Sequence, residues 1–154
     1  MSVDRAFTVS IAKREGKKPP AVTIINCFLK FGWSLCSPQN RIIYTDVGDS
    51  DDFDFLDRHI AEDEYLRIAA QKELKDEVIA FALFYAEDGN TYRVNVLIMP
   101  NLSNCEIVIS PSDETRKMLM PDLNILDVNW YFCKILPPLL KSNMLIETFS
   151  YSQY

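Results

Sequence analysis

Apolar and polar residues alternate in several stretches of the chain with the period of two that is typical of β-strands. Residues Arg5 to Ile11 alternate loosely, which predicts a strand at the edge of a sheet, and Leu145 to Tyr151 predicts a last strand. Arg41 to Val47 is rich in β-branched and aromatic residues, as strands are. Val78 to Tyr85 is apolar on both faces, which predicts a central strand covered on each side.

A β-hairpin is the strongest local signal in the sequence. Glu87-Asp88-Gly89-Asn90 supplies residues that tolerate a positive φ, and a second strand follows over Tyr92 to Met99. After the turn from Pro100 to Asn104, Cys105 to Ile109 predicts a third strand. Because strands joined by short turns pair antiparallel, we expect a meander here.

Helical spacing appears in two segments of the first half of the chain. Pro19 and Pro20 suit a helix start, and apolar residues recur at about 3.6-residue spacing over Pro20 to Phe31, so we expect a helix that Gly32 ends. A second helix is predicted from about Ile60 to Lys75. Tyr65, Ile68, Ala69 and Lys72 lie on one stripe of this helix. On its exposed side Asp63 and Arg67 are four residues apart and are expected to pair.

The last third of the sequence predicts two further helices. Ser110-Pro111-Ser112-Asp113 resembles a cap, a proline and a first-turn acid that open a short helix. Asp127 caps an amphipathic segment whose shared apolar face holds Val128, Tyr131, Phe132, Ile135, Leu136 and Leu139. Pro137-Pro138 must kink or stop this helix, because proline lacks the amide donor and clashes with the preceding turn.

The element order β, α, β, α, β, β, β, α, α, β predicts an α+β fold, with helices packed on a mainly antiparallel sheet. Of the 154 residues, 48% are hydrophobic and 25% are charged, so we expect a single α+β domain over residues 1–154. No apolar run approaches the roughly 20 residues of a membrane span, and the N-terminal stretch lacks the pattern of a secretory signal. We therefore expect a cytoplasmic protein without membrane contact.

Negative charge is concentrated in one segment, from Asp46 to Glu64. It holds nine acids against the single base Arg58, a balance of −8, whereas the whole chain has 22 acids and 16 bases. The remainder, with 13 acids and 15 bases, is therefore +2. Each neighbouring pair of like charges costs a few tenths to about 1 kcal/mol, and the crowding helps folding in no evident way. Solubility alone accounts for such a loop, and binding of a cationic partner is the functional alternative.

Aromatic residues stand among these acids. The predicted partner-binding residues are Asp46, Asp49, Asp51, Asp52, Phe53, Asp54, Phe55, Asp57, Glu62, Asp63 and Glu64. Charge raises the rate of encounter with a basic protein surface, and apolar side chains slow release. An acidic surface repels DNA, so nucleic acid is not an expected partner.

The sequence lacks the motifs of common enzyme classes. His59 is the only histidine, and no Gly-x-Ser-x-Gly motif accompanies it. The four glycines are too far apart to form a phosphate-binding loop. The four cysteines are widely spaced among apolar neighbours, which predicts buried free thiols. We therefore expect no catalytic activity and no cofactor.

A metal-dependent hydrolase is a weaker alternative. Oxygen ligands suited to a divalent cation occur close together at Asp49, Asp51, Asp52 and Asp54. Against the EF-hand pattern, however, Phe53 stands where a ligand belongs and Asp54 where glycine must turn. Glu73-Leu74-Lys75 has the acid-x-lysine spacing of a magnesium-dependent nuclease, but it lies in a predicted helix.

Two stretches carry a resemblance to a known family. Ile42 to Phe55, with the sequence IIYTDVGDSDDFDF, is followed by an acid-rich helix and the hairpin, and Asp127 to Pro137 has the sequence DVNWYFCKILP. In the order and kind of its elements the chain resembles the small immunity proteins encoded beside bacterial polymorphic toxins. The resemblance implies an inhibitor that binds a cognate toxin domain in the cytosol and covers or distorts its active site.

Many toxins of this kind are nucleases with basic clefts, for which an acidic loop is an electrostatic counterpart. The leading hypothesis is therefore an immunity protein that binds a basic toxin domain through Asp46 to Glu64. The second hypothesis is an adaptor or regulatory module that binds another cytosolic protein.

Overall fold

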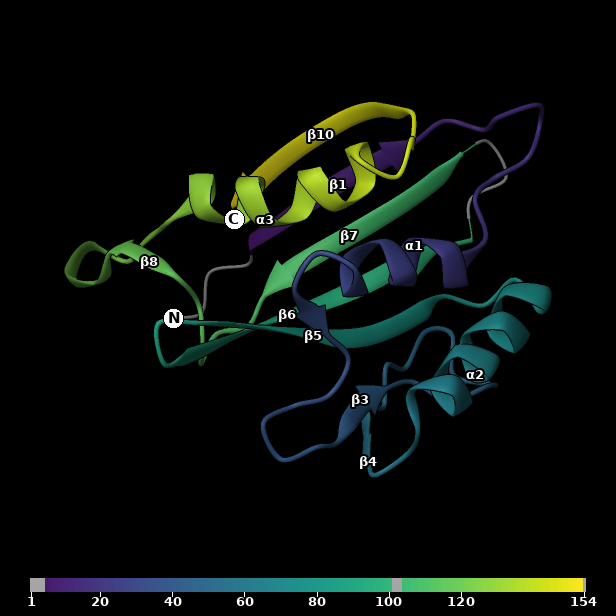
Figure 1. The fold of residues 1–154 in the computed structure, drawn as a ribbon, viewed down its shortest axis with the longest axis horizontal. Coiled ribbons are helices and arrows are strands. Elements are labelled where there is room, and N and C mark those ends of the chain that lie inside the picture. Colours follow the sequence, from purple (N-terminus) through teal and green to yellow (C-terminus); the bar gives the residue numbers. More distant parts are fainter. Residues whose placement is uncertain (1–4, 101–103, 154) are drawn as a thin grey trace.

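An antiparallel sheet is the centre of this computed structural model, which describes residues 5–100 and 104–153. Its strands are β1 (Arg5–Ile11), β2 (Trp33–Ser34), β3 (Ile42–Tyr44), β4 (Leu56–Arg58), β5 (Ile79–Glu87), β6 (Asn90–Met99), β7 (Cys105–Pro111) and β10 (Ile146–Gln153). They lie in the order β10-β1-β7-β6-β5-β3-β4, with β2 paired to β5 beside this path (Figure 1). All these pairings are antiparallel.

Three helices of the described residues pack near this sheet: α1 (Ala21–Leu29), α2 (Glu62–Leu74) and α3 (Val128–Leu140). In Figure 1, α1 and α3 lie across one face of the sheet and α2 lies beside β3 and β4. α1 contacts both of the other helices. The α+β prediction, with helices on a mainly antiparallel sheet, is confirmed.

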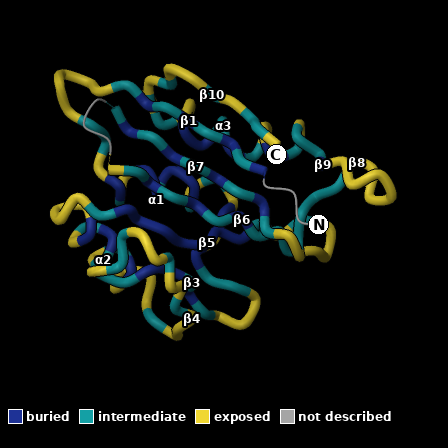
Figure 2. Tube along the Cα trace, turned by 180° about the vertical axis from the view of Figure 1, so that it is seen from behind, coloured by how far each residue is buried: buried dark blue, intermediate teal, exposed yellow. Residues whose placement is uncertain are grey.

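Side-chain alternation explains which sheet face the helices cover. In β1, Phe7, Val9 and Ile11 are buried, and the residues between them are partly exposed. β6 and β7 alternate in the same way, and the burial pattern is visible along the central strands in Figure 2. β5 is buried at each position from Ile79 to Phe84, as its doubly apolar sequence predicts.

The predicted hairpin forms between β5 and β6. Glu87 pairs with Asn90, so Asp88 and Gly89 are the two loop residues. Their φ angles are 52° and 79°, which is the left-handed conformation that a tight hairpin turn needs. The turn predicted over Pro100 to Asn104 lies largely outside the described residues.

The two predicted helices of the first half also form. α1 follows Pro19 and Pro20, and Gly32 comes shortly after its end with φ +96°. A Cβ atom at Gly32 would lie 2.9 Å from Cε2 of Tyr85, so this position needs glycine for space as well as for its backbone angle. α2 buries Tyr65, Ala69 and Lys72 of the predicted stripe.

Several predictions about the sheet are wrong. β1 is not an edge strand, because it pairs with β7 on one side and with β10 on the other. No helix opens at Ser110: β7 continues to Pro111, which pairs with Val94. Residues 56–58 lie in the predicted acidic loop, but in the structure they form the strand β4 at the edge of the sheet, beside β3. β1 pairs with strands far away in the sequence, whereas β4 and the end of β7 form strands only through pairing with a neighbouring strand, which local sequence patterns do not show.

Predictions about the helices also need correction. Pro137 and Pro138 do not stop α3 at once, since it extends to Leu140. Phe132 does not share the buried face of Tyr131, Ile135 and Leu139: it is 41% exposed. Asp63 and Arg67 form no ion pair among the described residues.

An unpredicted arm follows β7. It consists of β8 (Met118–Met120), the short 3-10 helix η1 (Pro121–Leu123) and β9 (Ile125–Leu126), which pairs with β8. The arm projects from the body of the molecule at the left of Figure 1.

Candidate functional site

The acidic segment from Asp46 to Glu64 has three structural parts. Residues 46–55 form a loop after β3, Leu56–Arg58 form the edge strand β4, and Glu62 to Glu64 form the first turn of α2. The segment therefore occupies one border of the sheet, where β3, β4 and α2 meet (Figure 1).

A buried lysine holds the loop in place. Lys72 of α2 is 0% exposed, and its Nζ donates hydrogen bonds to the backbone oxygens of Asp46, at 2.7 Å, and Asp49. The same Nζ lies 3.2 Å from Oε1 of Glu77, which neutralises its charge. Since an unpaired buried ammonium is very costly, these contacts bind the loop tightly to α2.

Glu77 adds a second link to the loop. Its Oε1 accepts a hydrogen bond from the backbone N–H of Gly48 at 2.8 Å. This bond is the main cause that holds the pKa of Glu77 below its ordinary value, and Lys72 lowers the pKa further. The ionised carboxylate therefore favours the folded loop.

Two of the predicted binding residues have a folding role. Asp49 accepts hydrogen bonds from the backbone N–H groups of Phe53, at 2.9 Å, and Asp54, at 2.7 Å. Asp46 accepts one from the N–H of Val47 at 2.8 Å. The expectation that these acids do not help folding is wrong for both, because their carboxylates satisfy backbone donors of the loop.

Asp57 also has an internal partner. Its Oδ1 lies 2.9 Å from Nε of Arg41, and its backbone oxygen accepts a second hydrogen bond from the same guanidinium at 2.7 Å. The two contacts join β4 to the residue that precedes β3. Asp57 therefore supports the edge strand.

Six carboxylates of the segment are exposed and form no hydrogen bond or ion pair within the described residues. They belong to Asp51, Asp52, Asp54, Glu62, Asp63 and Glu64. The last three lie in the first turn of α2, where the helix dipole favours negative charge. The first three have no such compensation and lie on a loop that Lys72 fixes.

The two phenylalanines of the segment differ. Phe53 is half-buried and has φ 51°, which places it in the left-handed region. Phe55, just before β4, is 37% exposed. We name the six free carboxylates together with Phe55 the acidic face. It combines unpaired charge with one apolar side chain on a fixed backbone.

The described residues contain no group of three or more His, Cys, Asp or Glu side chains that converges to hold a metal ion. Both carboxylate oxygens of Asp49 are already bound to backbone N–H groups. His59 is exposed, and its Nδ1 lies 2.9 Å from the backbone oxygen of Asn40. The loop geometry thus serves backbone donors and gives no support to a cation site.

The four cysteines are free thiols, as predicted, but only Cys27 and Cys105 are buried. Cys36 is half-buried, and Cys133 on α3 is exposed. Burial raises the pKa of Cys105 to about 11, and burial together with nearby Glu62 raises that of Cys36. Neither of these two thiols is activated as a nucleophile, because a nucleophilic cysteine needs a lowered pKa.

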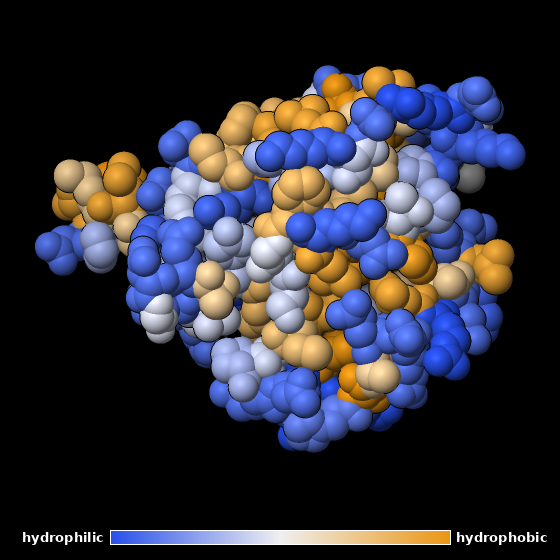
Figure 3. All heavy atoms as spheres, in the orientation of Figure 1, coloured by the Kyte–Doolittle hydropathy of each residue, from blue (hydrophilic) through white to orange (hydrophobic). Residues whose placement is uncertain are grey.

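A second exposed surface is the apolar arm, residues 118–126, which the sequence patterns did not single out. Its exposed apolar side chains are Leu119, Met120, Leu123 and Ile125, from 41% to 66% exposed. Figure 3 shows apolar side chains on this projection, away from the main body. Clustered exposed apolar residues are typical of protein-binding surfaces. The run Met118-Leu119-Met120 was the signal available in the sequence.

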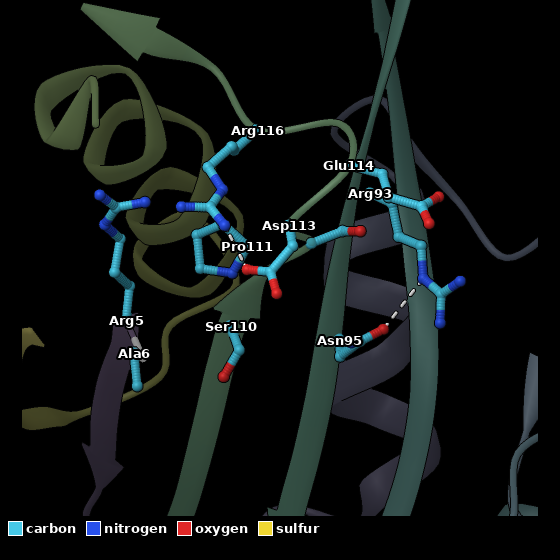
Figure 4. Close-up of a pocket in the computed structure, with 10 residues that line it drawn as sticks. Arg5, Ala6, Arg93, Asn95, Ser110, Pro111, Asp113, Glu114 and Arg116 are labelled. Atoms are coloured by element: carbon cyan, nitrogen blue, oxygen red, sulfur yellow. Dashed lines mark hydrogen bonds and ion pairs between the residues drawn. The ribbon is translucent and has the colours of Figure 1, made fainter. Parts of the chain in front are cut away.

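A hollow of about 460 Å³ lies where β1, β6 and β7 meet residues 112–116 (Figure 4). Its charged lining residues are Arg5, Arg93, Asp113, Glu114 and Arg116. Arg116 pairs with Asp113, and Arg5 donates to the backbone oxygen of Asn124 and to Gln153. Internal partners therefore take up much of the charge, and the lining residues include no histidine or cysteine.

None of the helices in the described residues is long and apolar enough to cross a membrane. Comparison of the chain with protein-family models, with curated protein sequences and with solved structures finds no match.

Proposed function

We propose that this chain is a non-enzymatic immunity protein that binds a basic surface of a cognate toxin domain through its acidic face. The residues assigned to the contact are Asp51, Asp52, Asp54, Phe55, Glu62, Asp63 and Glu64. Asp46, Asp49 and Asp57 act indirectly, because they hold the loop and β4 in shape. Phe53, half-buried beside them, lies within the same loop.

The observation that carries the proposal is free charge on a fixed backbone. The loop is bound through Lys72 and Glu77, yet the carboxylates of Asp51, Asp52 and Asp54 have no hydrogen-bond or ion-pair partner among the described residues. A loop that only kept the molecule in solution would not need this anchoring. Fixing a binding loop before the encounter lowers the entropy lost on association, which strengthens binding.

The charge of the face suits a cationic partner. Six unpaired carboxylates speed encounter with a basic surface, and Phe55 supplies apolar contact once the surfaces meet. A nuclease toxin has such a basic surface, because its cleft must hold a phosphate backbone. The proposed mechanism is therefore competition: the acidic face occupies positive charge that the toxin uses for its substrate.

Co-expression with a candidate toxin domain, sought among the genes that flank this one, tests the proposal. The wild-type chain should restore growth and co-purify with the toxin domain. The triple variant Asp51→Lys, Asp52→Lys, Asp54→Lys should lose both effects at the same expression level.

A matched control separates the face from net charge. The variant Glu15→Lys, Glu114→Lys, Asp122→Lys makes the same charge change at three exposed sites away from the face, and it should still protect. If the wild-type chain neither protects nor binds the toxin domain, the immunity function is wrong. If only the control variant fails, the interface lies elsewhere.

A second candidate function is an adaptor for another protein, and the apolar arm is the observation in its favour. Leu119 and Leu123, 63% and 66% exposed, are accessible to a partner without any change in the fold. An adaptor that uses the arm would bind its partner with little dependence on salt. Substituting both leucines with serine would then abolish binding, whereas lysines at Asp51, Asp52 and Asp54 would not.

A further inference from the structure

The two edges of the main sheet differ in how open they are to another strand. β4 is three residues long, Leu56–Arg58, and carries charged Asp57 and Arg58. β10 is eight residues long, and from Thr148 to Gln153 it contains no charged residue and no proline. Long uncharged edges pair readily with further strands, and short charged edges resist this. β10 is therefore the edge that is available for pairing.

The sequence of β10 is complementary to itself. In an antiparallel pair of two β10 strands centred on Ser150, Phe149 lies opposite Tyr151 of the second copy, and Thr148 lies opposite Ser152. Aromatic pairs and pairs of hydroxyl residues both stabilise neighbouring strands. Glu147, the only charged residue of β10, lies opposite the uncharged Gln153 of the second copy in this register. No like charges therefore meet in the pair.

This register also fixes which sheet faces adjoin. Phe149 and Tyr151 lie on the face that the helices cover, since both rings contact buried Phe7. Because Phe149 meets Tyr151 in this register, the two copies place their helices on the same side of a continuous sheet.

Helix α3 then provides an apolar contact between the copies. The ring centroids of Phe132 and Phe149 are 4.5 Å apart, so this side of α3 adjoins the β10 edge. Phe132, Leu136 and Leu140 are four residues apart and form one stripe, and Phe132 and Leu140 are 41% and 55% exposed. Figure 3 shows apolar side chains along this margin of the molecule, over α3 and β10. The two-fold arrangement turns both stripes toward each other.

We infer that β10 and the exposed stripe of α3 form an interface with a second copy of this chain. The resulting two-fold dimer joins two sheets through β10. Since β4 is at the opposite end of the strand order, the dimer leaves both acidic faces free at its two far ends. The inference does not depend on the function proposed for the acidic face.

Sedimentation velocity of the full chain over a series of concentrations tests the inference. The wild-type protein should form a species of twice 17.8 kDa. Ser150→Lys places two lysines opposite each other at the axis and should raise the dimer dissociation constant at least about tenfold. Phe132→Ser should weaken the dimer through the helix stripe.

Thr23→Lys, an exposed site on α1, is the matched control and should leave the dimer unchanged. Circular dichroism checks that each variant folds. If Ser150→Lys does not fold, the effect of Phe132→Ser on the dimer tests the inference. A wild-type chain that stays monomeric at all concentrations overturns the inference. A dimer that persists unchanged in the folded variants overturns it equally.

Discussion

At the scale of single residues, Lys72 has the largest influence on the acidic face although it is not part of it. Its stem lies among the buried residues of α2, and its ammonium group replaces water with two backbone oxygens and the carboxylate of Glu77. A lysine in an apolar helical stripe is the sequence signal for such an arrangement, because a buried ammonium requires partners.

Removing this ammonium should release the loop. Lys72→Met keeps the apolar stem but leaves the backbone oxygens of Asp46 and Asp49 without their buried donor. We expect a loss of about 2 kcal/mol in the free energy of unfolding and faster hydrogen exchange at Phe53 and Asp54. Lys75→Met, at an exposed site, is the control. Equal stability of the two variants would show that Lys72 does not hold the loop.

Tyr65 is a single residue whose replacement should increase the stability of the protein. It is 0% exposed, its ring packs against Tyr44 and Phe81, and its hydroxyl has no hydrogen-bond partner among the described residues. An unsatisfied buried hydroxyl destabilises the folded state, so Tyr65→Phe should raise the free energy of unfolding by about 1 kcal/mol. Urea denaturation measures this change, and a clear decrease would mean that the hydroxyl is bonded in solution.

At the scale of elements, the loop between β3 and β4 depends on the ionisation of Glu77. Its pKa in the folded protein is lowered, so its contribution to loop stability is complete above the ordinary value of 4.5 and is lost as the pH falls through the lowered pKa. The backbone N–H of Gly48 should therefore lose protection from hydrogen exchange in acid. Glu77→Gln should show reduced protection already at neutral pH.

The comparison with Glu77→Gln isolates this carboxylate from the other acids of the loop. In the variant, the acid-dependent change at Gly48 should be smaller than in the wild-type protein. Protection that is the same at neutral and acidic pH in the wild-type chain would contradict the assigned role of Glu77.

The elements that sequence patterns predicted well are those determined locally. The β5–β6 hairpin follows from Asp88 and Gly89, whose positive φ angles the turn requires, and α2 follows from its helical spacing. β4 was missed because three residues in an acidic run form a strand only through pairing with β3. The central position of β1 depends on β10, more than 130 residues away, and no local pattern carries that information.

The candidate site was only partly predictable for the same reason. Charge counts located the segment from Asp46 to Glu64, but they did not separate acids that face solvent from acids that fold the loop. That separation depends on where backbone N–H groups point, as for Asp49, and on the partner Arg41 for Asp57. The apolar arm was missed because its exposure results from tertiary structure.

At the scale of the whole molecule, three surfaces lie at separate places on the fold. The acidic face lies at the β4 border, the apolar arm projects after β7, and the β10 edge lies opposite β4 (Figure 1). Among the described residues, the only large exposed apolar side chains outside these surfaces and the adjoining stripe of α3 are Leu74 and Leu145. Since exposed apolar residues concentrate at binding surfaces, their distribution favours a protein whose work is binding other proteins.

The rate of association with a candidate toxin domain, sought among the genes that flank this one and measured by stopped flow at low and high salt, tests the central claim most directly. With Asp51, Asp52 and Asp54 replaced by lysine, we expect the rate at low salt to fall at least about tenfold and its salt dependence to flatten. The control with lysine at Glu15, Glu114 and Asp122 should stay close to the wild-type rate. Equal rates in the two variants would contradict the assignment of the acidic face as the binding surface.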